Sequence, residues 1–117
     1  MIEVTLLQNN ILHIEGIEMH GLNDYWWLWR YNWARATVTI VDGLGAPVEA
    51  ATVHGVWSGD VSWEGERVTQ SDGTCVFDSP WRWDWWGQGD YTLTVDLVSK
   101  NGYTWDGIVV SETLLYP

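Results

Sequence analysis

The sequence predicts an all-β protein built from two sheets that pack face to face. Between Trp33 and Gly59, two runs alternate apolar and polar side chains with a period of two residues, which is typical of half-buried strands. The first run covers residues 34–41 and the second covers residues 51–58. Residues 42–45, Asp-Gly-Leu-Gly, join them with turn chemistry, since glycine tolerates positive φ and aspartate can bond the turn's own amides. No segment shows the 3.6-residue period of a helix.

Further strands are expected before and after this pair. In chain order they cover residues 2–7, 11–17, 61–69, 74–77, 91–98 and 103–110. In residues 91–98 the alternation places Tyr91, Leu93, Val95 and Leu97 on one face. Together these strands predict a sandwich of seven or more strands in a single domain, residues 1–117.

Turn signals define how three of these strands connect. The turn at residues 8–10 makes residues 1–20 an N-terminal hairpin or an exchangeable edge strand, because an uncapped edge pairs readily with another chain. The turn at residues 70–73 leads into the strand at 74–77. The Lys-Asn-Gly turn at residues 100–102 predicts a return strand that opens at Tyr103 and continues through Val110.

Length and charge restrict the classes of function. A chain of 117 residues can bury roughly two thirds of its unfolded surface, enough for one sandwich core. The net charge is -11, with five Lys and Arg residues in total, so that a phosphate backbone or an anionic membrane surface would be repelled. No apolar run approaches the ~18 residues of a membrane span. Nucleic-acid binding and membrane insertion are therefore not expected.

The single cysteine and the first residues bear on the compartment. Cys75 has no partner for an intramolecular disulfide, and its apolar setting predicts a small core residue rather than a reactive thiol. Met1-Ile2-Glu3 lacks the basic and apolar regions of a signal peptide. No signal peptide is therefore predicted in this chain.

Several motifs occur in the order found in a known family. The run from Ala36 to Gly59, followed by residues 69–77 and 91–95, resembles the immunoglobulin-like β-sandwich modules found beside the catalytic domains of secreted bacterial proteases and in other surface proteins. The resemblance covers roughly residues 33–106. It implies an antiparallel immunoglobulin-like sandwich with an extracellular, accessory role, and it implies no shared ligand or active site. In one departure, Arg67 stands where such modules often carry a second cysteine, so that their usual disulfide with the position of Cys75 cannot form.

Two short blocks hold most of the eleven tryptophans. Residues 25–33 contain four tryptophans and two tyrosines, more than one strand face can bury, because successive side chains point to opposite faces. Residues 81–86 lie between a proline and a glycine and are expected to form a loop or short hairpin, with Trp81, Trp83 and Trp85 on one side. The predicted ligand or interface patch consists of Trp26, Trp27, Trp29, Arg30, Trp81, Arg82, Trp83, Asp84, Trp85 and Trp86.

Three interpretations of this patch remain open. Indole rings stack on the apolar faces of sugar rings, and Arg82, Asp84 and Asn32 would then bond the sugar hydroxyls. Indoles are also enriched at protein interfaces. In the third interpretation the rings form an aromatic mini-core that holds the two loops together. The other strand tryptophans are expected in the sandwich core: Trp33, Trp57, Trp63 and Trp105.

Catalysis is not predicted. The three histidines, His13, His20 and His54, are far apart in the sequence and have no Cys or Glu at metal-ligand spacing. Ser58 lies outside a nucleophile-elbow motif. Glu64 and Glu66 share one strand face, where a solvated surface is the simpler interpretation than a catalytic pair.

Cofactors are not expected, with calcium as the one candidate. Aspartates lie in or beside turns, where carboxylates and carbonyls can converge on a cation. None of them has the spacing of an EF-hand, and turn formation alone explains an Asp-Gly pair. These aspartates are Asp42, Asp72, Asp78, Asp84 and Asp90.

The sequence therefore predicts a non-catalytic, extracellular or cell-surface interaction module that binds a polysaccharide or a protein through its Trp-rich patch. The alternative is a self-assembling structural subunit of a fibre or shell. There, residues 2–7 or residues 108–116 would pair with the edge of the next copy and produce a homo-oligomer. A spacer that only positions a neighbouring enzyme is what the family resemblance alone implies.

Overall fold

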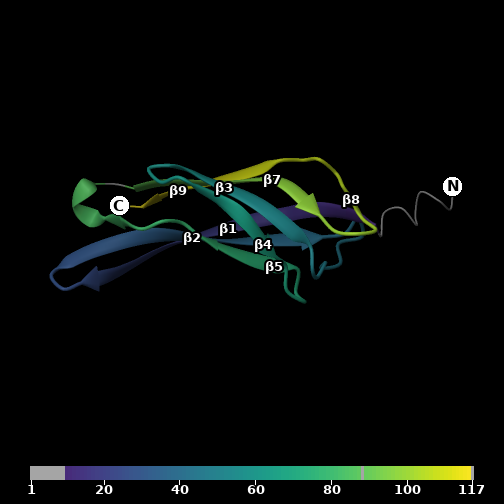
Figure 1. Cartoon of the computed structure of the whole chain (residues 1–117), viewed down its shortest axis with the longest axis horizontal. Coiled ribbons are helices and arrows are strands. Elements are labelled where there is room, and N and C mark those ends of the chain that lie inside the picture. The colour runs from purple at the N-terminus through teal and green to yellow at the C-terminus, as the bar shows by residue number, and fades with distance from the viewer. Residues whose placement is uncertain (1–9, 88, 117) are drawn as a thin grey trace.

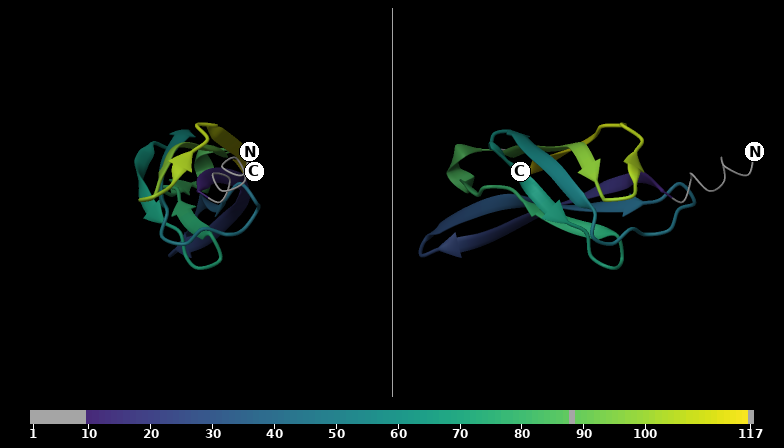
Figure 2. Two further views of the ribbon diagram at one scale, coloured as in Figure 1. Left: turned by 90° about the vertical axis from the view of Figure 1, so that its right-hand side faces the viewer. Right: turned by 45° about the vertical axis from the view of Figure 1, so that its right-hand side comes forward.

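Two β-sheets lie face to face, and the described residues contain no α-helix, which confirms the all-β prediction (Figure 1). The computed structural model describes residues 10–87 and 89–116. One sheet has the strand order β5-β2-β1-β8, with β6 also paired to β2, and the other has the order β4-β3-β7-β9. In an end-on view the strands surround a common interior (Figure 2). The elements are β1 (Ile11–Trp26), β2 (Trp29–Val41), β3 (Thr52–Gly59), β4 (Trp63–Val68), β5 (Thr74–Asp78), β6 (Arg82–Trp83), the 3-10 helix η1 (Asp84–Trp86), β7 (Gly89–Ser99), β8 (Thr104–Trp105) and β9 (Val110–Tyr116).

A long hairpin of β1 and β2 dominates the first sheet. The two strands pair from His13 opposite Val41 to Trp26 opposite Trp29, and their tip projects past the neighbouring strands (Figure 1). The strand expected at residues 11–17 is the start of β1. The strand expected at residues 2–7 and most of its turn lie outside the described residues.

The period-two pattern correctly predicted which face of β2 is buried. Ala34, Ala36, Val38 and Ile40 are all fully buried between the sheets. Facing them from the second sheet are, among others, Val53, Trp57, Tyr91, Leu93 and Val95. Each fully buried valine, leucine or isoleucine among them contributes about 1.5–3 kcal/mol relative to full exposure.

The prediction that Leu97 shares a face with Tyr91, Leu93 and Val95 of β7 is wrong. His54 pairs with Leu97 while the next residue, Gly55, pairs with Val95, so that Asp96 is an extra residue. Such a β-bulge reverses the alternation after it. Leu97 is therefore exposed, and Val98 is buried instead.

The tryptophans expected in the core divide into two groups. Trp57 is buried, and Trp63 and Trp105 pack against the core from its edge, as predicted. Trp33 is not a core residue, because it lies one residue before Ala34 and so points to the outer face of β2.

The predicted return strand is also corrected. Thr104 and Trp105 do not pair with β7; they form β8, which pairs in parallel with Ile11 and Leu12 of β1 in the other sheet. The crossing lets Trp105 pack against the core, and it makes one strand pair of the sandwich parallel. The antiparallel return along β7 begins only at Val110.

Cys75 is a small core residue, as predicted, and Arg67 packs against two aromatic rings near it. Cys75 is buried and unpaired. The Arg67 guanidinium lies 4.9 Å from the ring centre of Trp63 and 5.7 Å from that of Phe77, which are distances for cation–π contact. Burial raises the pKa of the Cys75 thiol to about 12, against a smaller lowering by the charge of Arg67. A buried thiol of this kind is inert.

We predict that Cys75 does not react with a disulfide-exchange reagent in the native protein at pH 8. Burial keeps the thiol protonated and shields it from the reagent. The reaction should become fast and complete in denaturant, which serves as the control for total thiol. Fast labelling under native conditions would contradict the burial of Cys75.

Candidate aromatic binding surface

The two Trp-rich blocks meet in space. Strand β6 pairs with β2, with Tyr31 opposite Trp83 and Asn32 opposite Arg82. The hairpin tip and η1 consequently lie at the same end of the molecule (Figures 1 and 2). The pairing brings together two segments that are about fifty residues apart in the chain.

Strand alternation sorts the side chains of this region onto two faces. Trp29, Tyr31 and Trp33 point away from the core, and because directly opposite residues share a face, Trp26 and Trp83 point the same way. We call the resulting set of outward rings the aromatic face. Its members are Trp26, Trp27, Trp29, Tyr31, Trp33, Trp81, Trp83 and Trp85.

The rings of the aromatic face form a continuous series of contacts. Trp83 and Trp85 stack with centroids 4.6 Å apart and an interplanar angle of 9°. Trp85 meets Trp29 edge-on at 6.2 Å, and Trp29 stacks on Trp26 at 5.7 Å. Each such contact contributes about 0.5–1.5 kcal/mol beyond the area it buries. The rings therefore hold the hairpin and the β6–η1 segment together.

Despite these contacts, the rings of the aromatic face remain open to solvent. The exposed fractions are 74% for Trp27, 62% for Trp26, 56% for Trp85, 54% for Trp81 and 40% for Trp29. Contiguous exposed apolar surface of this kind is uncommon on soluble proteins and marks interaction sites.

Four of the rings enclose a groove. Trp26, Tyr31, Trp81 and Trp83 line a space of about 360 Å³, within the range of about 300–1,000 Å³ typical of ligand pockets. Trp81 and Trp83 meet at 76°, and Tyr31 meets them at 62° and 86°. Rings at such angles wall a groove from several sides rather than forming one flat platform.

A chain of hydrogen bonds, buried at Tyr91 and Asn32 and exposed at Arg30, lies beneath the aromatic face. The hydroxyl of Tyr91 donates to Asn32 Oδ1, and Asn32 Nδ2 and Arg30 Nε both donate to the carboxylate of Asp84. Asn32 is only 1% exposed. The chain runs from β7 in the second sheet, through β2 in the first, to η1.

The pKa values reflect this arrangement. Burial raises the pKa of Tyr91 to about 12, so that it stays a hydroxyl donor. Burial by itself would also raise the pKa of Asp84, but the hydrogen bonds from Asn32 and Arg30, with the positive charge of Arg30, hold it below its ordinary value. Asp84 is therefore an ionised acceptor at neutral pH.

Four predicted site residues lie outside the aromatic face. Arg30 and Asp84 form the ion pair beneath it. Arg82 is only 5% exposed, and its Nη1 donates to the carbonyl of Gly87 at 2.7 Å. Trp86 is exposed, and its ring centre lies 5.8 Å from the Arg82 guanidinium rather than against the other indoles. With Asn32 also buried, the polar groups expected to bond sugar hydroxyls are engaged in holding η1 in place.

Sequence reasoning missed three residues of this surface. Tyr31 and Trp33 lie two and four residues after Trp29 in the same strand. Because alternate residues of a strand share a face, the sequence spacing could have assigned both to the face of Trp29. Asp24 is exposed and lies directly opposite Tyr31 on β1, so that it places a carboxylate on the aromatic face. Only the register of the hairpin reveals it.

The hairpin turn carries a backbone strain. Trp27 has φ 59°, in the left-handed region that costs an L-residue roughly 1–2 kcal/mol. Two-residue hairpin turns normally place Gly, Asn or Asp at such a position. Strain of this kind is concentrated at functional sites, and here it presents the most exposed indole of the protein.

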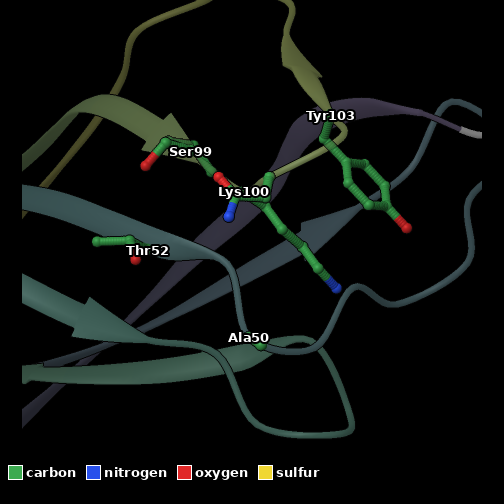
Figure 3. Close-up of a pocket in the computed structure, with 7 residues that line it drawn as sticks. Ala50, Thr52, Ser99, Lys100 and Tyr103 are labelled. Carbon is green, nitrogen blue, oxygen red and sulfur yellow. The ribbon is translucent and has the colours of Figure 1, made fainter.

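A second hollow, shown in Figure 3, lies towards the opposite end of the sandwich. Its lining includes Thr52, Lys100 and Tyr103. Lys100 Nζ donates to the carbonyl of Glu49 at 2.6 Å and lies 5.1 Å from the ring centre of Tyr103. The cation is thus engaged in structural contacts.

The histidines are separated in space and each pairs with a carboxylate. His13 lies 2.7 Å from Asp106, and His54 lies 2.5 Å from Asp96. The hydrogen bond to Asp96 is the main cause of a raised pKa of His54. Among residues 10–87 and 89–116, no three His, Cys, Asp or Glu side chains cluster as a metal site would require.

Two of the turn aspartates considered for calcium act within their own turns. Asp42 accepts from the amides of Leu44 and Ala46. Asp72 accepts from the hydroxyl and the amide of Thr74, and these two hydrogen bonds lower the pKa of Asp72.

Within the described part of the chain, no helix is long and apolar enough to cross a membrane.

No protein-family model matches the chain, and no curated protein or solved structure matches it. The immunoglobulin-like resemblance therefore stays a prediction from sequence motifs. Any functional conclusion depends on the chain's own residues.

We predict that Asp84→Ala lowers the free energy of unfolding by about 1–3 kcal/mol at pH 7, because it leaves the buried Asn32 amide without its acceptor. The folded-state pKa of Asp84 is depressed, so its contribution is present above the unfolded pKa of about 4 and is lost as the pH falls through the folded value. Denaturant titrations from pH 7 down to about pH 2 should show the gap between wild type and variant closing.

The matched control is Asp78→Ala, which removes a carboxylate from the exposed ion pair with Arg35. That change should cost no more than about 1 kcal/mol. Equal losses in the two variants would contradict a special role for Asp84.

Proposed function

We propose that the chain is a non-catalytic, immunoglobulin-like module of an extracellular or cell-surface protein, and that it binds a polysaccharide through the aromatic face. The observation that carries the proposal is the convergence of two distant Trp-rich blocks on one solvent-exposed surface. The family resemblance supports the fold type and the accessory role.

The sandwich does not need these rings for its core. The buried cluster is complete without them and is centred on residues such as Trp57, Phe77 and Tyr91. Exposed indoles that mainly contact one another cost solubility and give the sandwich little burial. A ligand that covers these indoles buries their apolar surface, and indoles contribute much of the free energy at binding surfaces.

A polysaccharide fits the chemistry of the face. Indole rings can stack on the apolar faces of sugars, and the rings extend as a series from Trp33 to Trp27 that suits a linear polymer. Asp24 is exposed and opposite Tyr31 on the same face, where its carboxylate can accept hydrogen bonds from sugar hydroxyls. The net charge of -11 disfavours polyanions, so the polymer is uncharged or cationic.

We predict that Trp85→Ala weakens polysaccharide binding at least about tenfold, because Trp85 is an exposed ring in the middle of the series. Retardation in native gels containing single polysaccharides, including neutral and cationic ones, measures the effect. Trp86→Ala is the matched control, since it removes an equally exposed indole of η1 on the side of Arg82, and its binding should stay unchanged.

Two results would count against the proposal. If neither variant alters the retardation of any polymer, while Trp85→Ala lowers stability, the aromatic face is a mini-core. If no polysaccharide retards the wild type but a protein partner binds it in a Trp85-dependent manner, the ligand class is a protein.

A second candidate function is self-assembly through a sheet edge. Strand β9 is the last strand of its sheet, and its region exposes Ile108, Val109 and Leu115. An apolar edge with unpaired backbone groups is a template for strand addition. A second copy could therefore extend this sheet.

If the chain is such a subunit, Leu115→Lys or deletion of residues 1–10 should abolish its oligomers. A lysine at the sheet edge blocks strand pairing, and the deletion removes the segment that the sequence predicts to pair with the next copy. Light scattering over a wide concentration range measures the mass. Polysaccharide binding should persist in both variants. A wild-type monomer at all concentrations would exclude self-assembly.

A further inference from the structure

We propose that the groove between Trp26, Tyr31, Trp81 and Trp83 binds a trimethylammonium cation, as carried by a choline substituent on the bound polymer. This inference rests on the proposed binding function of the aromatic face and assigns a ligand chemistry to one part of it. A cation positioned over aromatic faces is attracted by their quadrupoles.

The geometry of the groove suits a compact group better than a flat one. Tyr31, Trp81 and Trp83 meet in pairs at angles of 62°, 76° and 86°. Trp26 closes a further side, with its centroid 6.4 Å from that of Trp83 and a tilt of 59°. A roughly spherical trimethylammonium group can meet several such rings at once, whereas a sugar ring can stack on only one.

Charge also favours a cation. The protein carries a net charge of -11, and Asp24 lies opposite Tyr31 on the same face. Two of the three nearby arginines are paired with carboxylates, Arg35 with Asp78 at 2.7 and 2.9 Å and Arg30 with Asp84. The third, Arg82, is buried with its Nη1 donating to the Gly87 carbonyl, so it does not enter the groove. The acidic chain as a whole and the exposed Asp24 carboxylate therefore favour a cation over an anion at the groove.

The lining selects an alkylated cation over a primary ammonium. The four lining residues are all aromatic, so a primary ammonium would lose strong hydration and find few acceptors for its three donors. A quaternary ammonium has no N–H to satisfy and carries methyl groups that pack on the rings. The net attraction in such a site is largest for a desolvated cation.

The test compares choline with 3,3-dimethylbutan-1-ol, which has the same shape but no charge. Both are titrated into the full chain while the indole N–H signals are followed by NMR. Choline should shift the signals of Trp26, Trp81 and Trp83, whereas the neutral analogue should bind at least about fivefold more weakly. The buried indole N–H groups of Trp57 and Trp105 are internal controls and should not move.

Two variants locate the effect. Trp81→Ala removes an exposed wall of the groove and should weaken choline binding about tenfold. Asp24→Asn changes an exposed carboxylate without touching the core and should weaken it about twofold to fivefold. Trp86→Ala should leave it unchanged. If the thermal midpoint of Asp24→Asn equals that of the wild type, weaker choline binding by this variant cannot be caused by unfolding.

The outcomes separate this inference from the proposed function. Equal binding of choline and its neutral analogue, or no shift with choline, overturns the cation site, even if polysaccharides still depend on Trp85. Tighter binding of trimethyl-lysine than of choline would overturn the choline source, because it would assign the cation to a protein. If the wild type binds neither choline nor any polysaccharide, the proposed function is overturned as well.

Discussion

The position of the aromatic face depends on the buried hydrogen-bond chain from Tyr91 through Asn32 to Asp84. A fully buried amide without partners is costly, so Asn32 requires both the Tyr91 hydroxyl and the Asp84 carboxylate. Satisfying Asn32 fixes η1 under the hairpin and brings β6 into register with β2. The Asn32–Asp84 contact thus supports the convergence of the two Trp-rich blocks, which the pairing of β6 with β2 brings together.

Much of the fold could be predicted from the period of two, because it depends only on which side chains prefer burial. Ala34 to Ile40 illustrate this success. The bulge at Asp96 and the crossing of Thr104 and Trp105 to the other sheet could not be predicted, since each is decided by pairing with a distant strand. The excess of indoles predicted an exposed patch, but the inward direction of Arg82 follows from the register of a two-residue strand.

The interpretations of the tryptophans as a binding surface and as a mini-core are compatible. Trp83 touches rings from both blocks and is partly shielded, whereas Trp27 and Trp26 extend the same series into solvent. Rings that are immobilised by one another lose little further freedom when a ligand arrives, which lowers the entropic cost of binding. The strained backbone at Trp27 indicates that stability was not the only constraint on this tip.

The near-parallel indoles also give the protein an intrinsic optical signature. In the pairs Trp83–Trp85 and Trp26–Trp29, the electronic transitions of the two rings couple. Where the two transition dipoles are skewed within their ring planes, this coupling produces a split circular dichroism band that an isolated indole lacks. One of these pairs belongs to the β6–η1 segment and the other to the hairpin, so that the band reports on the rigidity of both segments without any attached label.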